Sequence, residues 1–155
     1  MKRRDILGAV LVLPAFAARA HHGWSSFDQE RPIYLEGRVT AVRWQNPHAE
    51  LEIELPVALR LPADLASRAL PAQSAQVDGK SMLARAQLPT RKDRKWEIEL
   101  APLTRLESWK VAPIRVGASV SLLGFTLKGE QGEAVLRADY LFVDGKTYAL
   151  RSGPA

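Results

Sequence analysis

The 155-residue sequence contains no cysteine and only two methionines, Met1 and Met82. The absence of cysteine excludes disulfide bonds, thiolate metal sites and cysteine nucleophiles. Two methionines are too few for a soft-ligand site that would hold copper(I). The sequence also lacks a glycine-rich phosphate loop, a nucleophile elbow and a carboxylate pair at a recognisable active-site spacing. These absences leave the question of an enzyme open and favour a binding protein.

The chain carries little excess charge once its first twenty residues are set aside. The formal net charge is +5, but that segment holds Lys2, Arg3, Arg4 and Arg19 against Asp5. Of the 22 basic and 17 acidic residues, 18 and 16 therefore remain. This small surplus gives no electrostatic reason to expect a nucleic acid as partner. A hydrophobic content of 46% with 25% charged residues is typical of a globular protein, and the length fits one domain.

The first twenty residues have the three-part pattern of an export signal. "MKRRD" is basic, "ILGAVLVLPAFA" is apolar but short for a membrane span, and "ARA" supplies small residues for a signal peptidase. We expect residues 1–20 to be cleaved, leaving a bacterial periplasmic or secreted protein with no membrane attachment. "RRDIL" has the residue order of twin-arginine signals, so the general and the twin-arginine route both stay open. Cleavage after Ala20 would make His21 the first residue.

Alternation of apolar and polar residues predicts a mainly β mature domain. The predicted strands lie in residues 33–44, 49–55, 95–100, 117–127 and 133–150, the last of them a hairpin that turns at Asp144-Gly145. In the first segment the apolar phase slips near Thr40 and Ala41, which predicts a β-bulge. "PLTRLESW" predicts a short helix between the third and fourth strands. This order predicts a small five- to six-stranded antiparallel barrel like the oligonucleotide/oligosaccharide-binding (OB) fold.

Residues 56–94 interrupt the strand pattern with a long segment rich in alanine and proline. We interpret this segment as an insertion into a single domain that covers residues 21–155. "PADLASRAL" has a proline at a helix start, and a second short helix is expected around residues 81–88. A connection of this length inside a compact domain is usually functional or flexible. The insertion is therefore a candidate surface for a partner protein.

The three histidines, His21, His22 and His48, are candidate metal ligands. An N-terminal histidine can chelate a metal with its α-amino nitrogen and its own ring, and a second imidazole completes a set of three nitrogens. Copper(II) favours such tetragonal nitrogen sites. The amine must first lose its proton, so acid should weaken binding. We expect His48 in the "QNPHA" turn to supply the second imidazole. His22 is a further candidate ligand, and Asp28 is a candidate oxygen ligand or an acceptor that orients a ring.

Each of these patterns also has a purely structural interpretation. His22 could be a surface residue, and His48 a turn residue bonded to backbone. The glutamates of two predicted strands are expected on solvated faces, paired with arginines such as Arg38 and Arg43. These glutamates are Glu50, Glu52, Glu54, Glu97 and Glu99. Three of the four tryptophans fall at core phases and are expected to pack there rather than stack on a ligand.

Several segments together resemble a family of small exported bacterial proteins of unknown function. The segments are "AHHGWSSFD", "LEGRVTAVRW", "NPHA", "WEIEL" and "LLG", and the family is marked by an N-terminal His-His and a Trp-x-Asn-Pro-His-Ala motif. The resemblance covers most of residues 20–55 and 95–150, and it implies a signal peptide followed by a compact β-barrel. The segment 56–94 departs from the family, in which a short turn is usual there. No activity comes with the resemblance.

Three functions are compatible with these observations. The first is a periplasmic copper(II) carrier or scavenger that uses His21 and His48 as its main ligands. The second is a metal-independent OB-like binding module that holds a partner protein or a small ligand on the barrel face or on residues 56–94. The third, a histidine-brace copper oxidase, ranks last because the sequence shows no recognisable substrate platform.

Overall fold

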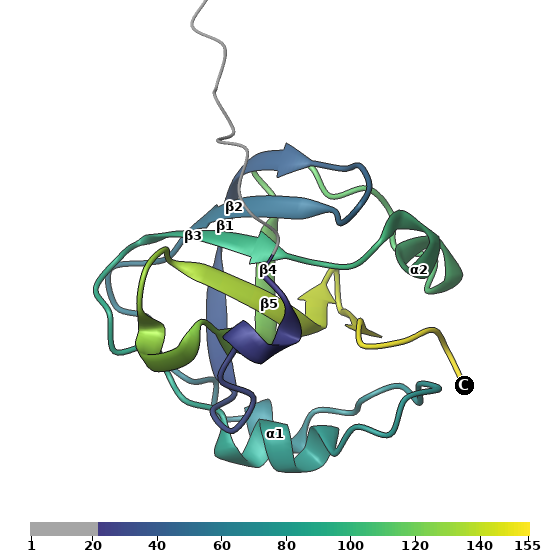
Figure 1. Cartoon of the computed structure of the whole chain (residues 1–155), viewed down its shortest axis with the longest axis horizontal. Helices are drawn as coiled ribbons and strands as arrows, with labels where there is room; N and C mark the ends of the chain where they lie inside the picture. The colour runs from purple at the N-terminus through teal and green to yellow at the C-terminus, as the bar shows by residue number, and fades with distance from the viewer. Residues whose placement is uncertain (1–21) are drawn as a thin grey trace, which may run out of the picture.

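The computed structural model describes residues 22–155, and the predicted signal peptide and His21 lie outside this part of the chain. The strands are β1 (Ile33–Arg43), β2 (Glu50–Glu54), β3 (Lys95–Glu99), β4 (Ser119–Thr126), β5 (Val135–Val143) and β6 (Lys146–Ala149) (Figure 1). The α-helices are α1 (Gly79–Arg85) and α2 (Leu103–Ser108), and short 3₁₀ turns are η1 (Trp24–Ser26), η2 (Leu65–Ser67) and η3 (Lys128–Glu130). No helix in residues 22–155 is long and apolar enough to cross a membrane.

Five strands close into a small barrel, and β6 adds a further strand at the edge. The strand order is β3-β2-β1-β4-β5-β6, and β3 also pairs with β5. The predicted barrel, with a short helix between β3 and β4, is confirmed. The closing β3–β5 pair is parallel, so the prediction of a wholly antiparallel barrel is wrong at this pair. The reason is topological, because a closed ring with an odd number of strands cannot alternate direction throughout.

A β-bulge lets β1 contribute to the core along its whole length. The register between β1 and β2 shifts between Val39 and Ala41, as the slipped apolar phase predicts. Val39 is buried before the bulge, and Val42 and Trp44 pack against the same interior core after it. The extra residue turns the strand so that both apolar phases face inward.

The insertion covers part of the outer surface of the barrel with a second apolar cluster. Its buried members come from the N-terminal segment, the insertion and the outer faces of the strands. They are Phe27, Tyr34, Leu65, Met82, Leu83, Leu123, Phe125, Val135, Tyr140, Phe142 and Ala149. In Figure 1, α1 lies below the barrel, on the far side from β2. The predicted helix over residues 62–70 is reduced to the single turn η2, and Leu65 and Leu70 of that stretch pack on the cluster.

The Tyr34 hydroxyl in this cluster donates a 2.6 Å hydrogen bond to Glu36 Oε2. Burial and this bond raise the pKa of Tyr34 from 10.0 to about 12. Because the folded state favours the neutral phenol, this contribution to stability is complete below pH 10.0 and is lost as the pH rises toward 12. In an ultraviolet titration, we expect Tyr34→Phe to remove an ionisation step near pH 12. Removal of a step near pH 10.0 would instead show that Tyr34 is solvated.

Gly124 allows β4 and β5 to approach each other closely. A Cβ atom added at Gly124 would lie 2.1 Å from the backbone oxygen of Arg137. We expect Gly124→Ala to lower the free energy of unfolding by about 3 kcal/mol, because the two strands must separate to admit the methyl group. Gly23→Ala is the matched control, since a Cβ there would meet only the Ser25 hydroxyl at 3.8 Å. Equal urea midpoints for the two variants would contradict the prediction.

Candidate metal-binding face

The first described residue, His22, lies on the outer face of β5. Its backbone carbonyl accepts a hydrogen bond from Nη2 of Arg137, and its ring meets the Phe27 ring edge-on with 6.4 Å between centroids. Phe27 is buried, and its backbone bridges to Leu127 just after β4. The N-terminal segment therefore follows a fixed path over the barrel before β1 begins.

Two arginines hold this N-terminal segment through its aromatic rings. The guanidinium carbon of Arg151 lies 4.0 Å from the centroid of the Trp24 ring, and that of Arg137 lies 4.8 Å from the same centroid. Arg137 also lies 4.3 Å from the centroid of the Phe27 ring. Partly desolvated cation–π contacts of this kind stabilise by about 1–2 kcal/mol each. The two side chains thus act as a clamp, which we call the arginine clamp, on the residues that follow His22.

Buried carboxylates orient both arginines of the clamp. Arg137 donates to Glu99 Oε2 through Nε at 2.7 Å, and Arg151 donates to both oxygens of Asp139 at 3.0 and 2.7 Å. Burial raises the pKa of the Asp139 carboxyl above its ordinary range, and the Arg151 charge opposes that rise. Because each guanidinium is tied to a fixed carboxylate, the clamp has little freedom to move away from Trp24.

The outer face of β2 and β3 is more buried than the sequence predicts. Glu50 and Glu99 are cross-strand partners, and each is only 6% exposed. The prediction of solvated glutamate rows is therefore wrong for these two residues. Glu50 is ion-paired with Arg43, as expected, and Glu99 with Arg137. The remaining glutamates of the two strands, Glu52, Glu54 and Glu97, are half-buried.

His48 lies on the same outer face as Glu50 and Glu99. The β2–β3 ladder continues past Glu50, because Ala49 donates to the Ala101 carbonyl at 3.0 Å and its own carbonyl accepts from Leu100. Ala49 is buried in the interior core, so strand alternation places His48 on the outer face with Glu50. Only β3 separates β2, which follows His48 by one residue, from β5, whose Arg137 contacts His22, so these two strands lie about 10 Å apart.

The turn before His48 is held in place by α2. Its Asn46–Pro47 peptide bond is cis, and Asn46 Oδ1 accepts a 3.1 Å hydrogen bond from the Leu103 backbone at the start of the helix. His48 itself is half-buried. A ring on such a short, tethered turn is well placed to be a fixed ligand.

Asp28 takes part in a turn ahead of β1. Its Oδ1 accepts from the Glu30 backbone at 3.2 Å, and its own backbone N–H donates to the Thr126 carbonyl at 2.9 Å. Within residues 22–155, no three His, Asp or Glu side chains lie close enough together to hold a metal ion. His21, the residue before His22, lies outside the described part of the chain.

The arginine clamp is the part of this face that sequence reasoning missed. Two charged residues two positions apart, Arg137 and Asp139, stand in the otherwise apolar segment "AVLRADYLFV". Both are buried, and the strand is buried on both faces over almost its whole length. Charges inside such a segment indicate buried ion pairs, because unpaired charges there would be too costly. Their partners could not be read from the sequence.

A family of unknown function (DUF6152) matches residues 9–59. This match covers about a third of the chain and ends soon after β2. It agrees with the expected resemblance to a family without an assigned function, and it includes the positions of all four candidate ligands. No curated protein and no solved structure matches the chain.

Proposed function

We propose that the mature protein binds copper(II) in the bacterial periplasm, as a carrier or scavenger, with His21 and His48 as its main ligands. The proposal includes export and cleavage after Ala20, which give His21 a free α-amine. The observation that carries it is the arginine clamp. The clamp fixes the chain immediately after His21, and only β3 lies between its strand β5 and β2, which follows His48.

The proposed role of each metal-binding group follows from its chemistry. The α-amine and the ring of His21 offer two nitrogens from one residue, and His48 offers a third from a tethered turn. Copper(II) stands at the top of the divalent affinity order for such donors. Glu50 and Glu99 add negative charge to the same face, although each is compensated by an arginine. The fixed backbone reduces the entropy lost when the three nitrogens are brought together.

Mass spectrometry and copper(II) spin resonance on the exported protein test this proposal together. The expected mature mass begins at His21, and the expected spectrum shows three coordinating nitrogens in a tetragonal site. A mature chain that begins at any other residue would contradict the proposal, because the α-amine would then belong to a residue other than His21. A spectrum unchanged from that of copper(II) in buffer would contradict it as well.

The second candidate is a metal-independent binding module, and the cleft described below favours it. Deleting residues 56–94 is a poor test, because Leu65, Met82 and Leu83 belong to the buried outer cluster. Substitutions of exposed residues in the insertion distinguish copper(II) binding from a metal-independent binding module more clearly. If the binding module is correct, such substitutions should abolish ligand binding while His48→Ala leaves it intact.

A further inference from the structure

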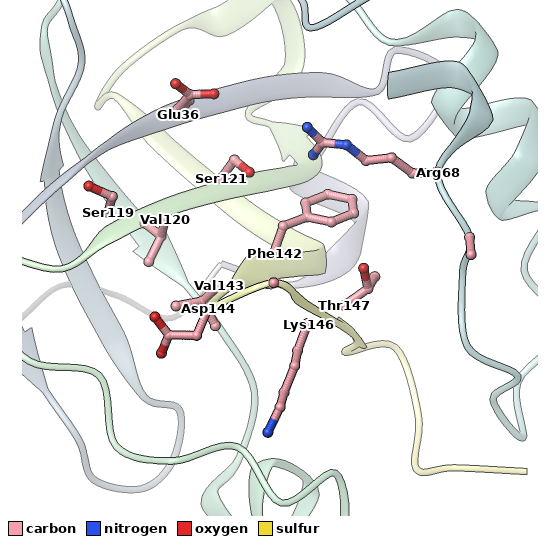
Figure 2. A pocket seen from close by; sticks show the side chains of 12 residues that line it. Glu36, Arg68, Ser119, Val120, Ser121, Phe142, Val143, Asp144, Lys146 and Thr147 are labelled. Atoms are coloured by element: carbon pink, nitrogen blue, oxygen red, sulfur yellow. The ribbon is translucent and has the colours of Figure 1, made fainter. Parts of the chain in front are cut away.

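A cleft lies between the insertion and the β5–β6 hairpin, and it shares no residue with the metal-binding face (Figure 2). Its volume of about 470 Å³ falls within the range of small-ligand sites. Val120, Phe142 and Val143 give it an apolar part, and the hydroxyls of Ser119, Ser121 and Thr147 also line it. The cleft can thus take a small ligand that has both apolar and polar groups.

Arg68 provides the positive charge on one side of the cleft. Its Nε donates to Asp64 Oδ2 at 3.0 Å, and its guanidinium carbon lies 4.8 Å from the centroid of the Phe142 ring. Figure 2 shows the guanidinium reaching over Phe142 into the cleft. Asp64 and Tyr34 occupy only part of the five-donor fork of Arg68, so donors remain for a ligand carboxylate. The insertion therefore supplies one cation, and Lys146 of the β5–β6 hairpin, which also lines the cleft, is a second.

Glu36 and Asp144 provide negative charge on the opposite side. Both carboxylates stand across the cleft from Arg68 in Figure 2. The Tyr34 hydroxyl donates to Glu36 Oε2, which fixes one oxygen of this exposed residue's carboxylate. Arg68 is held by Asp64 and also interacts with the Tyr34 hydroxyl, so Tyr34 links the two charged side chains. The cleft therefore has positive and negative side chains on different sides of an apolar surface. Such a cleft suits a ligand that carries both a positive and a negative charge.

We propose that this cleft binds a small zwitterion, an amino acid or a short peptide. The ligand carboxylate lies on Arg68, its ammonium lies toward Glu36 and Asp144, and its apolar side chain packs on Phe142 and Val143. The inference does not depend on copper, because none of these residues belongs to the metal-binding face.

Titration of the metal-free, ¹⁵N-labelled protein with three dipeptides tests this proposal. The probes are Gly-Leu, N-acetyl-Gly-Leu without the ammonium, and Gly-Leu amide without the carboxylate, all with a chelator present. Gly-Leu is expected to shift the amide signals of Ser121, Val143 and Thr147. Each blocked probe should bind at least about tenfold more weakly, since each loses one charge-assisted contact.

Two substitutions test which side chain of the cleft binds each charged group of the ligand. Arg68→Gln should remove the preference for Gly-Leu over its amide, and Glu36→Gln should reduce the preference for Gly-Leu over its acetylated form. Arg115→Gln, at an exposed position outside the cleft, is the matched control and should change neither preference. Absence of Gly-Leu binding, or equal binding of all three probes by the unaltered protein, would overturn the proposal. Arg68→Lys keeps the charge and should retain the carboxylate preference if Arg68→Gln fails to fold.

Discussion

Replacing Arg137 by leucine is expected to lower the free energy of unfolding by about 3–5 kcal/mol, the usual cost of removing one partner from a buried ion pair. Arg137 is only 8% exposed, and its guanidinium compensates the Glu99 carboxylate, which faces Glu50 across the sheet. Without Arg137, the buried carboxylates of Glu50 and Glu99 would share the single positive charge of Arg43. The same substitution removes the contacts to His22, Trp24 and Phe27, so the N-terminal segment should also loosen.

Urea unfolding and amide exchange measure these two effects separately. The Phe27 amide, which donates to the Trp24 carbonyl at 3.1 Å, should exchange much faster in Arg137→Leu. Replacing Glu99 by leucine as well should restore the part of the loss that comes from the unpaired carboxylate, because a buried pair exchanged for apolar residues is often neutral. The part that comes from the cation–π contacts with Trp24 and Phe27 should stay lost. Arg115→Leu at an exposed position is the control. A loss below about 0.5 kcal/mol in Arg137→Leu, the range of ordinary surface substitutions, would refute the clamp.

His48→Ala is expected to weaken copper(II) binding by at least about 100-fold. Loss of an outer-shell partner alone typically weakens metal binding 10–100-fold, and His48 is proposed as a direct ligand. His22→Ala should have a smaller effect, since the contact of His22 with Arg137 uses its backbone carbonyl. Competition titration against a chelator of known affinity measures both changes.

The matched control for His48 is Gln45→Ala, an exposed residue in the same turn. It should retain full copper(II) affinity. The unfolding midpoint of His48→Ala should stay close to that of the unaltered protein, which would show that the turn still folds. Equal copper(II) affinities for His48→Ala and Gln45→Ala would exclude His48 as a ligand.

The strands were predictable because their periodicity is strong and local. The alternation from Glu50 to Glu54, the slip at Thr40 and the turn at Asp144-Gly145 each follow from a few neighbouring residues, and each is confirmed. The barrel followed from the order of these elements. The parallel β3–β5 closure did not, because it depends on which distant strands meet when the sheet curls.

Only the types of ligand at the candidate site could be predicted from the sequence. A histidine pair and an Asn-Pro-His turn can be recognised in a sequence, but what holds the chain after His21 cannot. Arg137 and Arg151 are separated from Trp24 by more than a hundred residues. Their contacts arise only when β5 and the C-terminal segment meet the N-terminal turn. The burial of Glu50 and Glu99 was missed for the same reason, because alternation marks a face as polar without showing what covers it.

The most direct test of the central claim compares two proteins that differ by one N-terminal residue. One begins at His21, and the other carries a single alanine before it, with every side chain otherwise unchanged. If the α-amine of His21 chelates copper(II), the extended protein should bind at least about 100-fold more weakly in the same competition titration, since loss of an outer-shell partner alone costs about 10–100-fold. Equal affinities for the two proteins would show that the amine takes no part, and the proposed site would be wrong.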